Sequence, residues 1–305
     1  MNRFKQKLSY KYNMNIKEKI RENKPNISES SVKTYNSILS NLYKNVFSDD
    51  DYTLKNFNDT DTIIKYLKDL EPPKRKTILA ALVVLTDNKK YREVMLLDIE
   101  SSRTKSQQQE KTEKQKDNFI DGDTISKIYQ TLKKRANQLY KKGDLSYHEI
   151  QEIQNYIILT LYSGLYIPPR RAKDYTEFKI KNINKDKDNY MDKNEFVFNE
   201  YKTSKTYNQQ RVEIPKALKT IINKWIKIND TEYLLFDIHH KKLSNVTLNQ
   251  RIEKIIGKKM GVNGFRHTYM SEKYQSSIQA DKDMNEDFKN MGSSMHQKDV
   301  YIQKS

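Results

Sequence analysis

The spacing of apolar residues predicts a series of short helices in the first third of the chain. Between residues 28 and 46 apolar side chains recur every three or four positions, as on one face of a helix, and Ser28 is suited to cap its start. Three further segments show the same pattern: 59–70, 74–85 and 91–99. Pro72 and Pro73 end the first of these three. We therefore predict a helical domain over residues 26–100.

The helical pattern is lost at residues 101–117, which contain no apolar side chain. Such a segment cannot contribute to a core, so we interpret it as a linker between two domains. The basic residues 1–25 are predicted to be a solvated tail or a flexible DNA-binding arm. The remaining residues, 118–305, form the second predicted domain.

This second domain mixes helical patterns with a few strand-like ones. Residues 147–162 are apolar nearly all round, which predicts a central buried helix. Two short runs, 195–198 and 211–214, are typical of strands and end in turn residues or proline. Other helices are expected from a cap at Asp123 onward and over 216–228, 247–256 and 264–274. The expected fold class is mainly α with a small β-sheet, an α+β arrangement.

The composition indicates a polyanionic partner. The chain has 57 Lys and Arg against 40 Asp and Glu, a formal net charge of +17, although a codon bias toward Lys, Asn, Ile and Tyr would act in the same direction. A charge of this size attracts the phosphate backbone of nucleic acids. The absence of cysteine excludes disulfides, thiolate zinc sites and a cysteine nucleophile. No apolar run is long enough for a signal peptide or a membrane span, so we expect a soluble intracellular protein with no membrane contact.

Three segments carry residues suited to chemistry on a phosphodiester. The first is Pro168-Pro-Arg-Arg171-Ala-Lys-Asp174, in which two prolines precede two arginines at a predicted helix start. The second is Asn263-Gly-Phe-Arg266-His267, and the third runs from Met291-Gly-Ser-Ser294 to Tyr301 near the end of the chain. Arginine stays charged and pairs bidentately with phosphate oxygens, and tyrosine can serve as a covalent nucleophile.

The order and spacing of these segments resemble the tyrosine recombinase, or integrase, family of DNA breaking and rejoining enzymes. The resemblance covers nearly the whole chain: it implies a helical core-binding domain over 26–100, a polar linker over 101–117 and a tyrosine recombinase catalytic domain over 118–305.

The resemblance assigns phosphate binding to two arginines. Arg171 takes the place of the first family arginine, with Asp174 orienting it and Arg170 as a substitute. Arg266, between an aromatic residue and a histidine, matches the second family arginine. The family has an arginine directly after Gly-Leu, whereas Tyr166 stands there in this chain, so the first arginine is displaced along the sequence.

The family's catalytic lysine lies on a β-hairpin between the two arginine segments. By resemblance Lys202, between the two predicted strands, is the general acid that protonates the leaving 5′ oxygen, with Lys205 as second choice. Arg170, Lys205 and His267 form the predicted DNA-contacting set, and His267 is expected to be a buried histidine that supports the site.

Two family histidines are replaced. Asn263 stands at the first, where it can donate a hydrogen bond to a phosphate oxygen but cannot exchange a proton at neutral pH. Ser293 falls at the second, and His296 lies three positions further on as an alternative. Tyr301 is the predicted nucleophile, because its position after Ser293 matches the family spacing.

The resemblance implies a site-specific recombinase or integrase of a virus or other mobile element, acting through a 3′-phosphotyrosyl intermediate without a cofactor. Its expected partners are double-stranded DNA and, on DNA, three further copies of the chain in a homo-tetramer. It would be DNA-associated, in the cytoplasm or nucleus of a host cell. Two alternatives stay open: a type IB topoisomerase, which acts as a monomer, and a DNA-binding descendant of recombinases that has lost catalysis.

Overall fold

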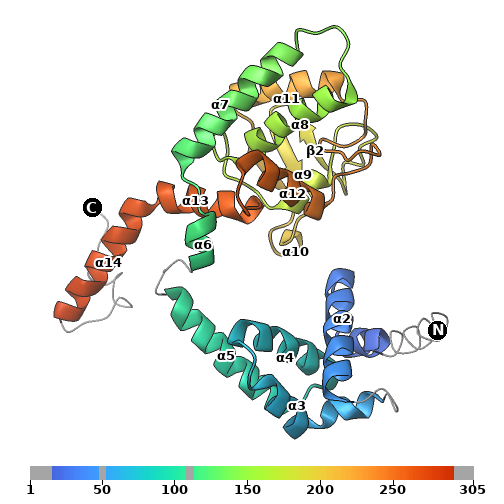
Figure 1. Cartoon of the computed structure of the whole chain (residues 1–305), viewed down its shortest axis with the longest axis vertical. Helices are drawn as coiled ribbons and strands as arrows, with labels where there is room; N and C mark the ends of the chain where they lie inside the picture. Colours follow the sequence, from blue (N-terminus) through green and yellow to red (C-terminus); the bar gives the residue numbers. More distant parts are fainter. Residues whose placement is uncertain (1–15, 48–52, 108–112, 292–305) are drawn as a thin grey trace. The chain divides into compact units, whose positions relative to one another are not determined.

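The computed structural model describes residues 16–47, 53–107 and 113–291. The chain divides into two compact units, Met1–Lys111 and Thr112–Ser305, each with a hydrophobic core of its own (Figure 1). The structure is mainly α with one small sheet, as the sequence predicts. None of the helices in the described ranges combines the length and the apolarity needed to cross a membrane.

All the regular secondary structure in the described residues of the first unit is helical. Its elements are α2 (Glu29–Val46), the 3-10 helix η1 (Leu54–Asn58), α3 (Thr60–Leu67), α4 (Pro72–Thr86) and α5 (Lys89–Gln107). The predicted cap at Ser28 is present, since its side chain accepts from the backbone N–H of Ser31 at 3.2 Å, and the carboxylate of Asp59 caps α3 by accepting from the N–H of Thr62 at 3.2 Å. The prolines that end one helical pattern occupy the first turn of α4, where a missing N–H costs nothing.

Residues 16–23, within the predicted basic tail, form a helix. Ile16 and Ile20 lie one turn apart on it and are fully buried in the core of the first unit. The expectation of a solvated tail or arm is therefore wrong for residues 16–23, because two isoleucines on one helical face gain more from burial than from solvation. Residues 1–15 lie outside the described part of the chain.

Much of the predicted linker, residues 101–117, is helical. Helix α5 continues to Gln107, and α6 spans Glu113–Asn118. Lysine, glutamine and glutamate have good helix propensity, so the absence of apolar residues excludes burial without excluding a helix.

The second unit contains all the strands of the described structure. Besides α6, its helices are α7 (Gly122–Leu139), α8 (Tyr147–Tyr162), α9 (Ala172–Thr176), α10 (Ser204–Tyr207), α11 (Lys216–Ile228), α12 (Asn245–Ile256), α13 (Val262–Lys273) and α14 (Gln275–Asn290). The cap of α7 is Asp121, whose carboxylate accepts from the N–H of Thr124 at 2.7 Å, so the predicted cap at Asp123 is wrong. Either aspartate satisfies the sequence rule, and the turn geometry decides between them.

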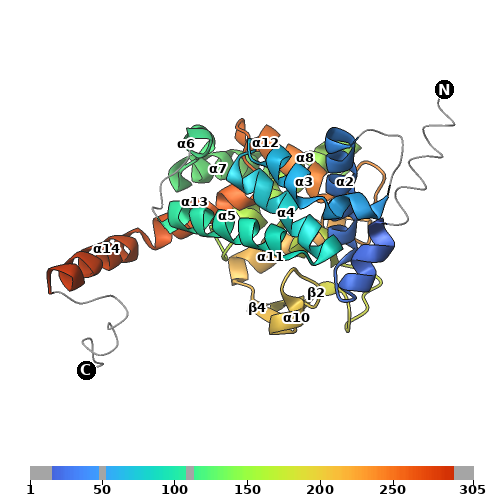
Figure 2. The same ribbon diagram turned by 90° about the horizontal axis from the view of Figure 1, so that it is seen from below.

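Four short strands form one sheet in the order β1-β2-β3-β4. They are β1 (Phe178–Lys179), β2 (Asn189–Asp192), β3 (Glu195–Phe198) and β4 (Gln210–Glu213). Strands β1 and β2 are parallel, and the other neighbours are antiparallel, with Phe196 opposite Val212. Helix α10 occupies the connection between β3 and β4 (Figure 2).

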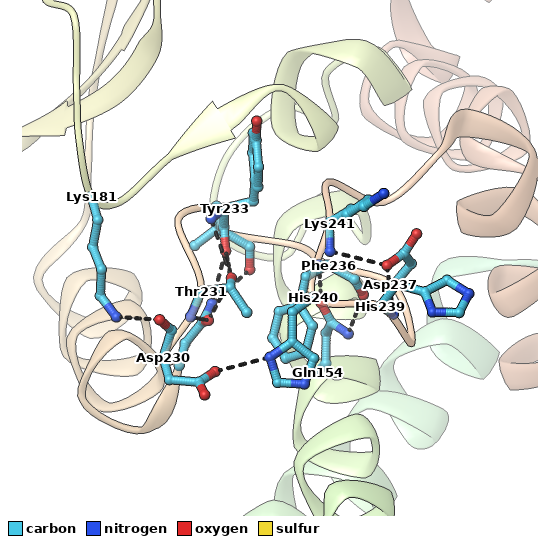
Figure 3. A network of polar contacts seen from close by, with 12 residues as sticks. Gln154, Lys181, Asp230, Thr231, Tyr233, Phe236, Asp237, His239, His240 and Lys241 are labelled. Carbon is cyan, nitrogen blue, oxygen red and sulfur yellow. Dashed lines mark hydrogen bonds and ion pairs between the residues drawn. The ribbon is translucent and has the colours of Figure 1, made fainter.

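Helix α8 is the centre of the second unit and organises the polar contacts around it. The buried side chain of Gln154 donates to the carbonyl of Phe236 at 3.0 Å and accepts from the N–H of Phe236 at 2.7 Å (Figure 3). In the same loop, the Asp237 carboxylate accepts from the N–H groups of His239 and Lys241 at 2.8 and 3.0 Å. These contacts fix the loop that leads from α11 into α12.

Helix α12 in turn holds α13. Arg251 of α12 donates to the side chains of Gln151 and Asn155 on α8, at 2.7 and 2.6 Å. Asn249, also on α12, accepts from the N–H of Val262 at 3.0 Å and so fixes the start of α13. Side-chain hydrogen bonds thus run from the central helix to the helix that carries one of the predicted arginines.

A candidate anion site lined by arginines

A pocket of about 310 Å³ opens on the surface of the second unit. Three separate parts of the chain line it: residues 167–171 with Asp174 of α9, the connection between β3 and β4 with β4 itself, and helix α13. Its lining residues are Ile167, Pro168, Pro169, Arg170, Arg171, Asp174, Tyr201, Thr203, Tyr207, Gln210, Val212 and Arg266. The lining therefore holds three arginines against a single carboxylate.

Two of these arginines form no ion pair with another described residue. Arg171 is the N-cap residue of α9, is half-buried, and its guanidinium makes no ion pair or hydrogen bond within the described part of the chain. Arg266 is also half-buried, and its guanidinium donates one long hydrogen bond, 3.4 Å, to the side-chain oxygen of Asn263. The charge of Arg171 also lowers the pKa of the Asp174 carboxyl, but three guanidinium groups against one carboxylate leave the described lining with an excess of positive charge that a bound anion would balance.

The third arginine, Arg170, forms an ion pair, a further hydrogen bond and a contact with an aromatic ring. Its Nε donates to the carboxylate of Asp174 at 2.7 Å, and its Nη2 donates to the side-chain oxygen of Gln210 at 3.0 Å. The guanidinium also lies over the ring of Phe198, 3.8 Å from the centroid, and 5.4 Å from that of Tyr201. Arg170 therefore ties the segment before α9 to β3, β4 and their connection.

The partner of Asp174 corrects one expectation. Asp174 forms its ion pair with Arg170 and not with Arg171, which the three-residue spacing had favoured. Residues three and four positions before Asp174 can both reach its carboxylate. The ring of Phe198 beneath the guanidinium of Arg170 favours Arg170 as the partner. Burial raises the pKa of Asp174 above its ordinary value, and the charge of Arg170 opposes that rise.

The connection between β3 and β4, residues 199–209, is fixed at both ends. The hydroxyl of Tyr201 donates to the carbonyl of Asn208 at 2.7 Å, and the amide of Gln209 donates to the side-chain oxygen of Asn199 at 2.7 Å. Lys202 and Lys205 are exposed on this connection, near the pocket but outside its lining. The prediction that Lys202 lies between two paired strands agrees with the topology, although a one-turn helix replaces a tight hairpin turn.

Tyr166, at the position where the resemblance expects the first arginine, packs against the core of the second unit. The hydroxyl of Tyr166 lies 2.5 Å from that of Tyr129, which is also 3.2 Å from the hydroxyl of Tyr156. The chain then turns, and the pocket lining begins at Ile167. A tyrosine at this position therefore stabilises the packing of α7 on α8, while the arginines that follow it face the pocket.

The other predicted residues are placed as follows. Asn263 is exposed at the start of α13, contacts Arg266 and does not line the pocket. His267 is exposed, so the expectation that it is buried is wrong: α13 buries Val262, Phe265 and Thr268, and His267 lies on the opposite face. Ser293, His296 and Tyr301 lie outside the described residues.

Sequence reasoning missed five lining residues on the lysine-bearing connection and its strand. These are Tyr201, Thr203, Tyr207, Gln210 and Val212. Gln210 opens the strand predicted from 211, and Tyr201 adjoins the predicted lysine, so their positions in the sequence were the available signals. Within the described residues no cluster of three His, Asp or Glu side chains is arranged to hold a metal ion.

No protein-family model and no curated protein matches the sequence. Among solved structures, a XerA recombinase resembles the chain with 11% identity and a TM-score of 0.35, over 85% of this chain and 83% of that one. A lambda integrase dimer bound to a COC′ core site has 15% identity and a TM-score of 0.46, over 88% and 90% of the two chains. Lambda integrase bound to DNA has 14% identity and a TM-score of 0.46, over 88% and 87%. We therefore infer a function from the side chains that line the pocket.

Proposed function

We propose that this chain is a DNA strand transferase of the tyrosine recombinase type, which cleaves and rejoins DNA through a 3′-phosphotyrosyl intermediate. The observation that carries the proposal is the pocket in which Arg171 and Arg266, from distant parts of the sequence, form no ion pair within the described part of the chain. Such a pair is suited to hold one phosphate of a DNA strand and to stabilise the extra negative charge of its transition state.

In the proposed reaction the phenolic oxygen of Tyr301 passes its proton to solvent water and attacks the phosphorus. A new P–O bond forms to the tyrosine, and the bond from phosphorus to the 5′ oxygen breaks. Lys202 donates a proton to that 5′ oxygen, with Lys205 as the alternative donor. Rejoining is the reverse step, in which a 5′ hydroxyl attacks the phosphotyrosine and releases Tyr301.

Asn263 and Ser293 take the places of two family histidines, so this chain would rely on lysine for the proton transfer. The contact between Asn263 and Arg266 supports a role for Asn263 in orienting that arginine and not in moving a proton. Arg170 and Asp174 would hold the pocket wall in place, while Arg171 and Arg266 bind the phosphate.

The proposed partner is double-stranded DNA, on which the chain would act as a homo-tetramer to exchange strands between two sites. A net charge of +17 favours binding to the phosphate backbone. The proposed role is integration or recombination of the DNA of a virus or other mobile element.

A second candidate is a DNA-binding descendant that has lost catalysis. It is favoured by one observation: Tyr166, at the position of a family arginine, is part of the tyrosine cluster between α7 and α8. This protein would bind DNA through the same pocket without forming a covalent intermediate.

A covalent-trapping experiment separates the two. Wild-type protein and Tyr301→Phe are incubated with nicked duplexes from the DNA that flanks the coding sequence, and adduct that resists SDS is measured. Adduct from wild type alone is the expected result. DNA binding without adduct from either protein would favour the inactive descendant, and adduct from both would assign the nucleophile to another tyrosine.

A further inference from the structure

Tyr207 is a strongly exposed aromatic side chain in the arginine pocket. Its side chain lies on the last residue of α10, is 64% exposed, and lines the same pocket as Arg171 and Arg266. Within the described residues its ring pairs with no other ring or cation, and its hydroxyl makes no hydrogen bond. A single exposed ring is common on protein surfaces, but this ring lines a pocket beside two arginines that form no ion pair within the described residues, so a ligand held by the arginines would also meet the ring.

The backbone under Tyr207 is held in place. Asn208 has φ +55° and ψ −154°, a conformation that residues with a side chain rarely adopt. Its carbonyl accepts from the hydroxyl of Tyr201 at 2.7 Å, and its N–H donates to the carbonyl of Ser204 at 2.8 Å. A fixed backbone with a free ring at its end is the arrangement expected of a preformed contact surface.

The charges near the ring narrow the choice of ligand. Lys202 and Lys205 are exposed on the same connection as Tyr207, and among the described residues that line the pocket the only carboxylate, that of Asp174, is paired with Arg170. A free phosphate would use the arginines and leave the ring uncovered. A nucleotide in a strand offers a phosphate and, attached to it, a deoxyribose and a base whose apolar faces suit an aromatic ring.

We infer that Tyr207 packs its ring against the sugar or base of the nucleotide next to the phosphate held by Arg171 and Arg266. This inference rests on the proposed function, since it takes that phosphate to be part of a DNA strand. Tyr207 would place the strand in the pocket through apolar contact, while the arginines supply the charge.

The two kinds of contact differ in their dependence on salt. Log affinity falls linearly as log salt concentration rises. Loss of one phosphate contact reduces the steepness of this fall by about 0.9, because fewer counterions are released. Loss of an aromatic contact weakens binding at every salt concentration and leaves the slope unchanged. Replacing Tyr207 should leave folding intact, because the side chain is mostly exposed.

The experiment measures the affinity of the full chain for a fluorescent, nicked, mixed-sequence duplex over a range of salt concentrations. We expect Tyr207→Ala to bind about tenfold more weakly with an unchanged slope. Tyr207→Phe, which keeps the ring, should bind like the wild type. Tyr147→Ala is the matched control, because Tyr147 is an exposed tyrosine of the same unit that stacks on His240 and does not line the pocket.

Wild-type affinity in Tyr207→Ala would overturn the inference, as would equal losses in Tyr207→Ala and Tyr207→Phe. Arg266→Ala and Arg171→Ala are measured alongside. If the arginine variants make the salt dependence less steep while Tyr207→Ala binds with wild-type affinity, the proposed phosphate site is supported and the Tyr207 contact is wrong. If neither arginine variant changes the slope, the phosphate site is wrong and the Tyr207 contact falls with it.

Discussion

Gly164 lies so close to the ring of Tyr269 that a Cβ on the glycine would come within 2.7 Å of the tyrosine Cδ2. Gly164 follows the end of α8 and has φ +83°, and Tyr269 lies on α13 one turn after Arg266. The contact therefore joins the segment that leads to Arg171 to the helix that carries Arg266. No other residue type fits both the backbone conformation and the space.

We expect Gly164→Ala to be destabilising and to disturb DNA binding. The added methyl group meets a ring carbon of a half-buried side chain, and the positive φ strains alanine, which together should cost about 1–3 kcal/mol of unfolding free energy. Urea unfolding measures the loss, and Gly143→Ala is the control, because a Cβ there meets nothing within 4 Å. Equal stability of the two variants would show that α13 does not pack against Gly164 as described.

Arg170→Lys should separate the positioning of the pocket from its charge. Lysine keeps the positive charge but loses the paired geometry with Asp174 and Gln210 and the stacking on Phe198. We expect covalent adduct to form more slowly while the salt dependence of DNA binding stays close to that of the wild type. Arg135→Lys, at an exposed ion pair on α7, is the control and should change neither property.

If Arg170→Lys instead lowers the slope of affinity against salt, Arg170 contacts a phosphate directly. The division of roles among the three arginines would then be wrong, and Arg170 would join Arg171 and Arg266 as a ligand.

The start of α8 should show a defined dependence on pH. A hydrogen bond from Lys142, and others from Ser146, hold the pKa of Glu149 at about 2, below its ordinary value of 4.5. Because the pKa is lower in the folded state, this stabilisation is present above pH 4.5 and is lost as the pH falls from 4.5 toward 2. The difference in unfolding free energy between wild type and Glu149→Gln should therefore be constant near neutrality and shrink below pH 4.5.

Glutamine can still form the capping box with Ser146, so this comparison isolates the charge of Glu149. Repeating it in a Lys142→Met background should remove most of the difference at neutral pH. A difference that does not change between pH 7 and pH 3 would contradict the assignment.

The sequence predicted those parts of the fold that depend on local patterns. The bounds of α8 and α11 agree with prediction, because the apolar residues of each helix and the residue that precedes it, Ser146 or Pro215, are local features of the sequence. Strands β1 and β2 were missed because neither shows the apolar alternation of a strand: β1 has two residues, and β2 begins with Asn189 and ends with Asp192. Helix α14 was also missed: its described side chains are almost all exposed, with Phe288 buried, so no apolar face marks it.

The candidate site could likewise be predicted where it depends on local motifs, and not where it depends on contacts between distant residues. Arg171 and Arg266 could be proposed from their local motifs, and the structure places both in one pocket. The pairing of Asp174 with Arg170 could not be predicted, because it depends on the ring of Phe198 beneath the guanidinium. The exposure of His267 depends on which face of α13 meets the core, and Phe265 and Thr268 take that face.

The most direct test asks whether the arginine pocket activates the phosphate that is cut. Covalent adduct on nicked flanking DNA is compared among wild type, Arg171→Ala, Arg266→Ala and Tyr301→Phe, with Arg211→Ala as the control. Arg211 is exposed on β4 and pairs with Asp192 and Glu195 outside the pocket lining.

We predict adduct from wild type and Arg211→Ala, none from Tyr301→Phe, and a rate at least about a hundredfold lower from each pocket variant, the usual cost of removing one charge-stabilising group from a transition state. Adduct formation at the wild-type rate by Arg171→Ala and Arg266→Ala would contradict the central claim, because the phosphate would then be activated elsewhere.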